Sequence, residues 1–409
     1  MMQKYFLLIL VFSCFHLYSQ TEQQISDFQK AQQREIERMS NEREQFIIDS
    51  EKEFEEYLKA EQEAYDEFIK SISKIWGNEN VIVSTNKDWV EYTDDKKGRS
   101  VVDFEKGEAR VEIVLTEEEA KDIEKIQEKV EEQVVDLLTT QGTTKDYDTE
   151  FEKREPLSDE AVLVGQVILP TEDNKTEKNT SDLPEKKLET DVKQLVETGD
   201  VKIEIVRGDD GVERKVASFT LNLAPDHIKT RAEKFTDDIK YFSKKYNLCP
   251  ALVCAIIHTE SYFNPKAKSH AAAYGLMQLV PKYGGRAAYK YVYGKDKTPT
   301  ALYLYNPKNN IELGTAYMNM LVTQSFNKIT CDDCRTLCAV AAYNTGAGNV
   351  SKAFTGNTKI SSAIPLINNY EYNDLYDHMS KKLPYKETRD YIKKVTERRA
   401  QYQEWGWEI

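Results

Sequence analysis

The chain has fewer basic than acidic residues and very little histidine. Its 409 residues include 56 Lys and Arg against 70 Asp and Glu, a formal charge of -14, and only 5 His. This acidic excess argues against a nucleic-acid backbone as the main partner. Zinc sites need four ligands of fixed geometry, and the histidines are not spaced to supply them. We therefore expect no nucleic acid, no metal and no cofactor.

A long apolar run is also missing. The longest one near the start, residues 5–12, is too short to span a bilayer and is typical of a secretory signal over residues 1–19. Residues 11–14 resemble a lipoprotein box that would place a lipid on Cys14, whereas a cut near residues 19–20 would leave a soluble protein. We expect an exported, periplasmic protein, anchored to the outer membrane if Cys14 is lipidated.

Glycine and proline are absent from residues 22–76, which are rich in charged and amide side chains. An eleven-residue apolar period, about 3.67 residues per helical turn, favours a nearly straight helix. We expect one long charged helix over residues 20–76. It would hold the rest of the protein away from a membrane, pair with another helix, or pack at one end and be solvated elsewhere. The recurring residues are Ile25, Ile36, Ile47, Leu58 and Ile69.

Residues 77–225 predict a small α/β domain. Alternating apolar residues indicate two hairpins, and we expect the second to extend the sheet begun by the first. Thr116 and Glu119 form a capping box that predicts a helix reaching residue 141. The almost purely polar residues near 170–200 predict a linker. The expected strands cover residues 81–84, 89–92, 101–104, 109–115, 201–205 and 219–223.

From about residue 226 to 409 the pattern is helical, so the predicted fold class is α+β, with an all-α C-terminal domain. Within it, Leu252, Ile256 and Glu260 recur every four residues and share one helix face. Burial on that face would raise the pKa of the Glu260 carboxyl and keep its proton near neutral pH. A single glutamate at a helix end is more often a solvated charge, so the neighbouring motifs decide between the two.

The cysteines after Cys14 leave their pairing open. An exported protein meets an oxidising compartment that permits disulfides. Cys331 and Cys334 form a CxxC pattern with Cys338 four residues further on. This trio would form a Cys331–Cys334 disulfide, bind a metal, or consist of two surface thiols and one core residue.

Four motifs give Glu260 a context. They are Glu-Ser at 260–261, Gly-Leu-Met-Gln at 275–278, Ala-Tyr-Asn at 342–344 and Glu-Thr-Arg-Asp-Tyr-Ile at 387–392. Their order and spacing resemble those of the lysozyme-like lytic transglycosylases, in the branch of the soluble lytic murein enzyme. Residues 73–107 and 223–232 are similar to the N-terminal region of the membrane-bound enzymes of this family. The resemblance covers most of the chain from about residue 70 onward.

This resemblance implies a goose-type lysozyme-like catalytic domain acting on peptidoglycan glycan strands. Glu260 matches the catalytic acid, which protonates the β-1,4 oxygen between N-acetylmuramic acid and N-acetylglucosamine. Its carboxylate then takes the proton of the muramyl C6 hydroxyl as that oxygen attacks C1, which gives a 1,6-anhydro ring. One carboxylate suffices, because no second group has to activate water or act as nucleophile.

The remaining motif residues are expected to bind substrate. For Met277 a place in the core, and for Tyr391 a role in helix packing, are comparable alternatives. A goose-type lysozyme that hydrolyses the same bond with water and an inactive wall-binding scaffold are the competing functions. Protein partners are not predicted. The expected substrate-binding residues are Ser261, Gly275, Met277, Gln278, Tyr343, Asn344 and Tyr391.

Overall fold

The computed structural model describes residues 2–170, 176–179 and 183–407, without the side chains of residues 2–26, 176 and 177. The predicted lipidation site, Cys14, therefore lies outside the described side chains. Residues up to Tyr57 form one compact unit and those from Leu58 onward a second, and we describe each by itself. Across the described residues, no helix is both long enough and apolar enough to cross a membrane.

Helix α1 runs from Met2 to Trp76 and makes up the first unit as far as Tyr57. Its described side chains there are mostly exposed, including the apolar Ile36 and Phe46. Ion pairs one helical turn apart, such as Arg38 with Glu42 at 3.2 Å, lie along its surface. Such exposed pairs contribute only a few tenths of a kcal/mol each, about 0.3–0.5.

The second unit contains a five-stranded antiparallel sheet in the order β1-β2-β3-β7-β6. Both predicted hairpins are confirmed, and they share one sheet because β3 pairs with β7, with Val111 opposite Phe219. The predicted strand at residues 81–84 is wrong. There the Tyr92 hydroxyl donates to the Ile82 carbonyl (2.9 Å) and accepts from its N–H (3.3 Å), so a side chain replaces a neighbouring strand. The strands are β1 Asp88–Tyr92, β2 Gly98–Asp103, β3 Glu108–Leu115, β6 Lys202–Arg207 and β7 Glu213–Asn222.

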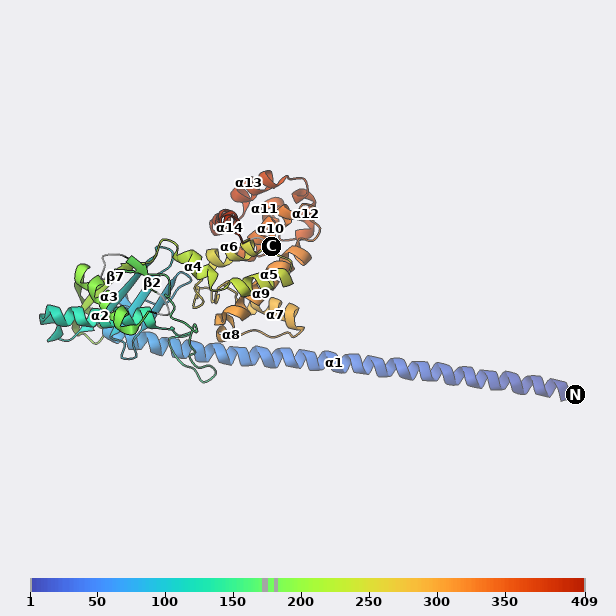
Figure 1. The fold of residues 1–409 in the computed structure, drawn as a ribbon. Coiled ribbons are helices and arrows are strands. Elements are labelled where there is room, and N and C mark those ends of the chain that lie inside the picture. Colours follow the sequence, from blue (N-terminus) through green and yellow to red (C-terminus); the bar gives the residue numbers. More distant parts are fainter. Residues whose placement is uncertain (1, 171–175, 180–182, 408–409) are drawn as a thin grey trace. The chain divides into compact units, whose positions relative to one another are not determined.

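Two helices, α2 (Ile123–Thr139) and α3 (Glu185–Thr198), lie beside this sheet (Figure 1). Their apolar faces share a core with alternate residues of β3 and β7. The other face of the sheet packs against the last turns of α1 around Trp76. Thr116 and Glu119 do bond each other, but they precede a short 3-10 turn, Glu119–Lys121. Helix α2 begins later because Asp122 accepts from the Glu124 N–H and caps it.

Helix α3 corrects the predicted polar linker near 170–200. Leu188, Val192 and Val196 are spaced by four residues and are all buried. Such a narrow stripe is enough to fix a helix onto a neighbouring core, even though its other residues are polar. Upstream, β4 (Ile168–Pro170) pairs with β5 (Thr176–Lys178). Residues 171–175 and 180–182, also within the predicted linker, lie outside the described residues.

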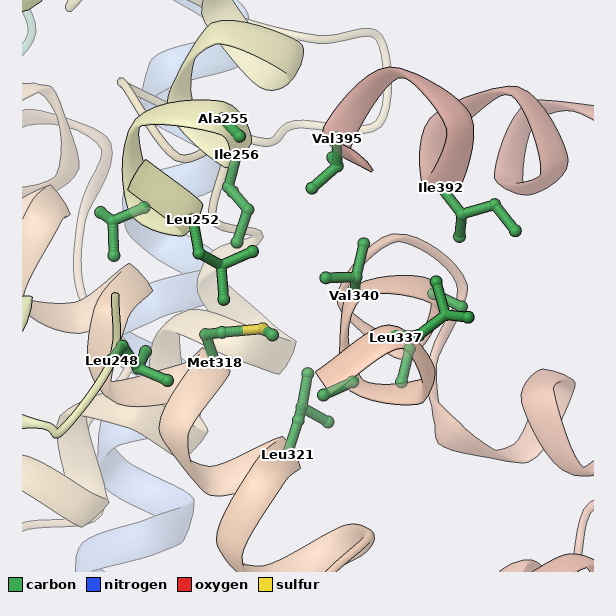
Figure 2. Close-up of a cluster of buried hydrophobic side chains, with 14 of the residues drawn as sticks. Leu248, Leu252, Ala255, Ile256, Met318, Leu321, Leu337, Val340, Ile392 and Val395 are labelled. Atoms are coloured by element: carbon green, nitrogen blue, oxygen red, sulfur yellow. The ribbon is translucent and has the colours of Figure 1, made fainter. Parts of the chain in front are cut away.

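The part after residue 226 is helical and encloses its own core. Figure 2 shows α6, α10 and α14 directing Leu252, Val340 and Val395 into a common interior. The coarse prediction of helices combined with a small antiparallel sheet is confirmed. The helices are α4 His227–Glu233, α5 Thr236–Lys245, α6 Pro250–Ser261, α7 Arg286–Tyr293, α8 Ala301–Tyr305, α9 Pro307–Met320, α10 Asp332–Thr345, α11 Ala347–Thr355, α12 Ile360–Ile367, α13 Tyr372–Lys382 and α14 Lys386–Glu404.

Candidate active site

Glu260 lies in the last turn of α6, on the face that buries Leu252 and Ile256, as the four-residue spacing predicts. The residue itself is only partly buried. Burial of its carboxyl raises the pKa of Glu260 to about 8, and the negative charge of Glu387 adds to this rise. The Tyr391 hydroxyl acts in the opposite direction. Glu260 is therefore a carboxylic acid that keeps its proton at neutral pH and still has access to solvent.

Two tyrosine hydroxyls accompany this carboxyl, Tyr343 from α10 and Tyr391 from α14. The Tyr343 hydroxyl donates to the Met277 carbonyl at 2.8 Å. The Tyr391 hydroxyl interacts electrostatically with Glu260 but makes no hydrogen bond of regular geometry to any described residue. Burial raises the pKa of both tyrosines, so both remain neutral donors beside the acid.

A second carboxylate, Glu387, stands one helical turn before Tyr391 on α14. It is exposed, and the Asn344 side-chain amide approaches its Oε1 at 3.5 Å. The Asn344 carbonyl oxygen accepts from the Thr388 hydroxyl at 2.7 Å. These contacts join the predicted Asn344 to the helix that carries Tyr391. Glu387 was not among the predicted site residues, although its four-residue spacing from Tyr391 indicates that both lie on one face of α14.

Gly275 and Gln278 both have left-handed backbones, with φ of 75° and 47°. A Cβ on Gly275 would lie 2.2 Å from the Leu304 carbonyl oxygen, so close packing against protein requires this glycine. Gly275 is buried, which does not support its predicted place among the substrate-binding residues. The Gln278 amide nitrogen donates to the Ala267 and Gly275 carbonyls, each at 3.0 Å. Its carbonyl oxygen has no partner among the described residues.

Ser261 and Met277 are both fully buried, which favours supporting places behind the loop over contact with substrate and, for Met277, the alternative of a place in the core. The Ser261 hydroxyl donates to the Leu276 carbonyl at 2.7 Å and fixes the end of α6 to the loop that carries Gln278. Met277 fills the core against Gly314, where a Cβ would lie 2.3 Å from its sulfur, and its N–H donates to Asn310. Both residues position the loop from inside.

The chain turns sharply directly after the acid. Tyr262 and Phe263 both have positive φ, 52° and 58°, which residues other than glycine rarely adopt. Their carbonyls accept from the guanidinium of Arg231 of α4 at 2.9 and 2.6 Å. Arg231 is buried, with its guanidinium 3.4 Å from the centre of the Phe104 ring and a third bond to Gln166.

Further contacts to this turn come from the loop before β1, from the turn between β2 and β3, and from α14. The Asn86 side-chain amide donates to the Glu260 main-chain carbonyl at 3.1 Å. The Tyr262 hydroxyl donates to Glu105 at 2.6 Å and accepts from Arg398 of α14 at 2.9 Å. The sequence analysis did not predict these contacts: Asn86 and Glu105 lie within residues 73–107, whose similarity to the family gives no role to single residues.

His258 and the cysteines take structural places. His258 is buried against the Tyr402 hydroxyl at 3.2 Å, and desolvation lowers its pKa to about 2, so it is a neutral core residue. Cys331 and Cys334 form a disulfide, and Cys338 is a separate buried thiol. In the described part of the chain, no group of three or more acidic, His or Cys side chains is arranged to hold a metal ion.

Two family models match successive parts of the chain. Residues 49–234 match the family model of the membrane-bound lytic murein transglycosylase C N-terminal domain, and residues 237–363 match the transglycosylase SLT domain. A membrane-bound lytic murein transglycosylase C from Cronobacter sakazakii is 31% identical over 338 residues, which cover 82% of this chain and 87% of that protein. The protein of the same name from Salmonella typhimurium is 32% identical over 337 residues, with the same two shares.

The solved 70 kDa soluble lytic transglycosylase from Escherichia coli superimposes with a TM-score of 0.32 at 26% identity, over 42% of this chain and 24% of that one.

Proposed function

The chain belongs to the membrane-bound lytic murein transglycosylase C family and is a lytic murein transglycosylase, and we propose that Glu260 is its catalytic acid. The substrate is peptidoglycan, cut between N-acetylmuramic acid and N-acetylglucosamine with a 1,6-anhydro product. The single observation that supports the residue assignment is the environment of Glu260. A carboxyl with a pKa of about 8, partly open to solvent and flanked by two neutral tyrosines, stores the proton that this reaction needs.

The chemistry follows from this one group. The Glu260 carboxyl gives its proton to the bridging oxygen, and the C1–O bond breaks as positive charge develops on the muramyl ring. The resulting carboxylate takes the C6 hydroxyl proton while that oxygen bonds to C1, so the acid is regenerated without water. The Tyr391 hydroxyl is free to donate to the transient carboxylate, whereas the proton of the Tyr343 hydroxyl is already given to the Met277 carbonyl. Retaining the nucleophile within the substrate also removes the entropic cost of bringing it to C1.

For substrate binding, we propose Gln278 and Asn344. The Gln278 carbonyl oxygen is buried and lacks a partner among the described residues, while the residue itself is partly exposed, so a sugar hydroxyl or acetamido N–H that reached this oxygen would satisfy it. Asn344 is partly exposed beside Thr388, and its amide has only the long contact to Glu387. Residues 226–409 would form the lysozyme-like catalytic domain.

The relatives' name describes membrane-bound proteins, which agrees with an enzyme of the cell envelope. For this chain we propose a periplasmic location, with anchoring to the outer membrane through a lipid on Cys14.

A hydrolase is the second candidate, because Glu387 is a second carboxylate whose charge reaches Glu260. Product analysis separates the two. Digestion of purified sacculi followed by mass spectrometry should give muropeptides that end in 1,6-anhydro rings, and Glu387→Gln should keep this product. Reducing ends, which are 18 Da heavier by the mass of one water, together with loss of activity in Glu387→Gln, would identify a hydrolase that uses Glu387 as its base.

A further inference from the structure

A pocket of about 560 Å³ opens where three parts of the second unit meet. The end of α1 contributes Tyr65, the loop before β1 contributes Asn86, and the segment after α6 contributes Lys268 and Tyr274. No group assigned above to the reaction or to glycan binding lines it. Its size and its mixture of aromatic and charged walls are typical of a ligand site.

The three lysines that line this pocket differ in their partners. Lys145 is buried and pairs with Glu61 and with Glu152 at 3.3 Å. Lys266 is buried and pairs with Asp146 at 2.7 Å and Glu91 at 3.3 Å. The third lysine has no such pair.

The Lys268 ammonium lies over the ring of Tyr65 at 4.9 Å and that of Tyr274 at 6.0 Å. Its side chain is partly exposed, and no described carboxylate lies within salt-bridge distance of it. The two aromatic rings attract the ammonium group but accept no regular hydrogen bond from its N–H groups. Lys268 can therefore still donate hydrogen bonds to an anion.

The pocket adjoins the proposed active site through shared backbone. Asn86 lines the pocket and donates to the main-chain carbonyl of Glu260. Ala267, which precedes Lys268, accepts from Gln278, and Tyr274 pairs with both Lys268 and Leu279 through isolated bridges. A ligand in the pocket is therefore within one or two residues of the loop that carries Gln278.

We propose that this pocket binds the peptide stem of the peptidoglycan substrate, with a stem carboxylate bonded to Lys268. The inference rests on the proposed function for the substrate class. Stem peptides are attached to the muramyl group through an amide bond and carry several carboxylates, so a free cation in the pocket suits them. The charges of Glu61 and Asp146 also act on Lys268, but both carboxylates form their ion pairs with the other two lysines, so Lys268 is the cation left for an incoming anion. The enzyme then selects peptide-bearing strands over bare glycan.

The kinetic test compares two substrates, sacculi with their stems and strands stripped of stems by an amidase. Lys268→Met should lower kcat/KM on the peptide-bearing substrate about tenfold, mainly through KM, as loss of one charge-assisted hydrogen bond predicts. Its activity on stripped strands should not change. Lys268→Arg should retain most of the preference, and Lys295→Met, at an exposed loop lysine, should match the parent on both substrates. An equal loss on both substrates, or no loss on either, would overturn the proposal.

A binding measurement separates this proposal from the reaction itself. Calorimetry of the full-length Glu260→Gln protein with a free stem tripeptide should detect binding that disappears in the Glu260→Gln, Lys268→Met double variant. If the parent released no anhydro product from any substrate, the proposed function would fail while this binding remained measurable. Absence of tripeptide binding in an enzyme that does release anhydro products would refute the stem pocket alone.

Discussion

The helical and sheet regions contribute differently to the proposed active site. The helices supply the reacting group and its flanking hydroxyls, Glu260, Tyr343 and Tyr391. The part of the chain before residue 225 supplies no candidate acid, yet it bonds to the turn that follows Glu260 through Asn86 and Glu105. A helix end leaves its last carbonyls without internal partners, so groups from elsewhere must satisfy them. The helices therefore supply the acid, and the sheet region helps to position it.

The largest expected effect comes from the helical side. Glu260→Gln keeps the shape of the side chain but removes the transferable proton, so we expect release of anhydro muropeptides to fall about 1,000-fold or more. Binding to sacculi should be retained, which a pull-down with purified sacculi checks. Glu387→Gln is the matched control and should retain most of the activity. Measurable turnover near the parent rate in Glu260→Gln would reverse the assignment of roles.

The contribution of the turn is tested next. Arg231→Met removes the donors of two buried carbonyls in the strained turn, and each unsatisfied carbonyl costs about 1–3 kcal/mol. We expect the free energy of unfolding to fall by about 3 kcal/mol and kcat to fall more than KM changes. Lys229→Met, at an exposed position on the same helix, is the control and should be neutral. Equal unfolding midpoints in urea for both variants would contradict the role of this contact.

The raised pKa of Glu260 has a consequence for stability. Between the ordinary value of 4.5 and about 8, the folded chain holds a proton that the unfolded chain has released. The stability contributed by this proton is complete below pH 4.5 and is lost as the pH rises toward 8. Glu260→Gln does not titrate, so its stability should exceed that of the parent increasingly over this window, by on the order of a few kcal/mol. Parallel melting-temperature curves for the two proteins from pH 4.5 to 8 would show that the carboxyl titrates normally.

The smallest expected effects come from removing the hydroxyl of Tyr343 or of Tyr391, and the two variants should differ from each other. Tyr343→Phe loses the bond to the Met277 carbonyl and should cost about 1 kcal/mol of stability. Tyr391→Phe loses a hydroxyl that has no regular partner among the described residues, so its stability should barely change. Since this hydroxyl lowers the pKa of Glu260, its removal should move the alkaline limb of the pH–rate profile upward. A downward movement of that limb would exclude the proposed contact.

Local patterns explain which parts of the fold were predictable. The hairpins of the sheet were predicted because apolar residues alternate on β3 and β7, and the buried face of α6 because Leu252 and Ile256 precede Glu260 at helical spacing. Helix α3 was missed because four apolar residues in a polar segment give a weak signal until a partner surface is known.

Local patterns were also insufficient to assign roles to the residues of the proposed active site. Motifs identified Glu260, Tyr343 and Tyr391, but they do not distinguish a residue that faces substrate from one that supports the loop behind it. Ser261 therefore appeared as a binding residue although it is buried against Leu276. Contacts such as that of Arg231 depend on segments distant in the sequence, which no local pattern encodes.

A direct titration of the Glu260 carboxyl tests the central claim most closely. Carbon NMR of protein labelled at the glutamate carboxyl, assigned by comparison with Glu260→Gln, follows this one group across the pH range. The structure predicts that the Glu260 signal titrates with a pKa of about 8, so that the group is mostly protonated at neutral pH. Titration near the ordinary value of 4.5 would mean that Glu260 is a carboxylate at neutral pH and would contradict its role as the acid.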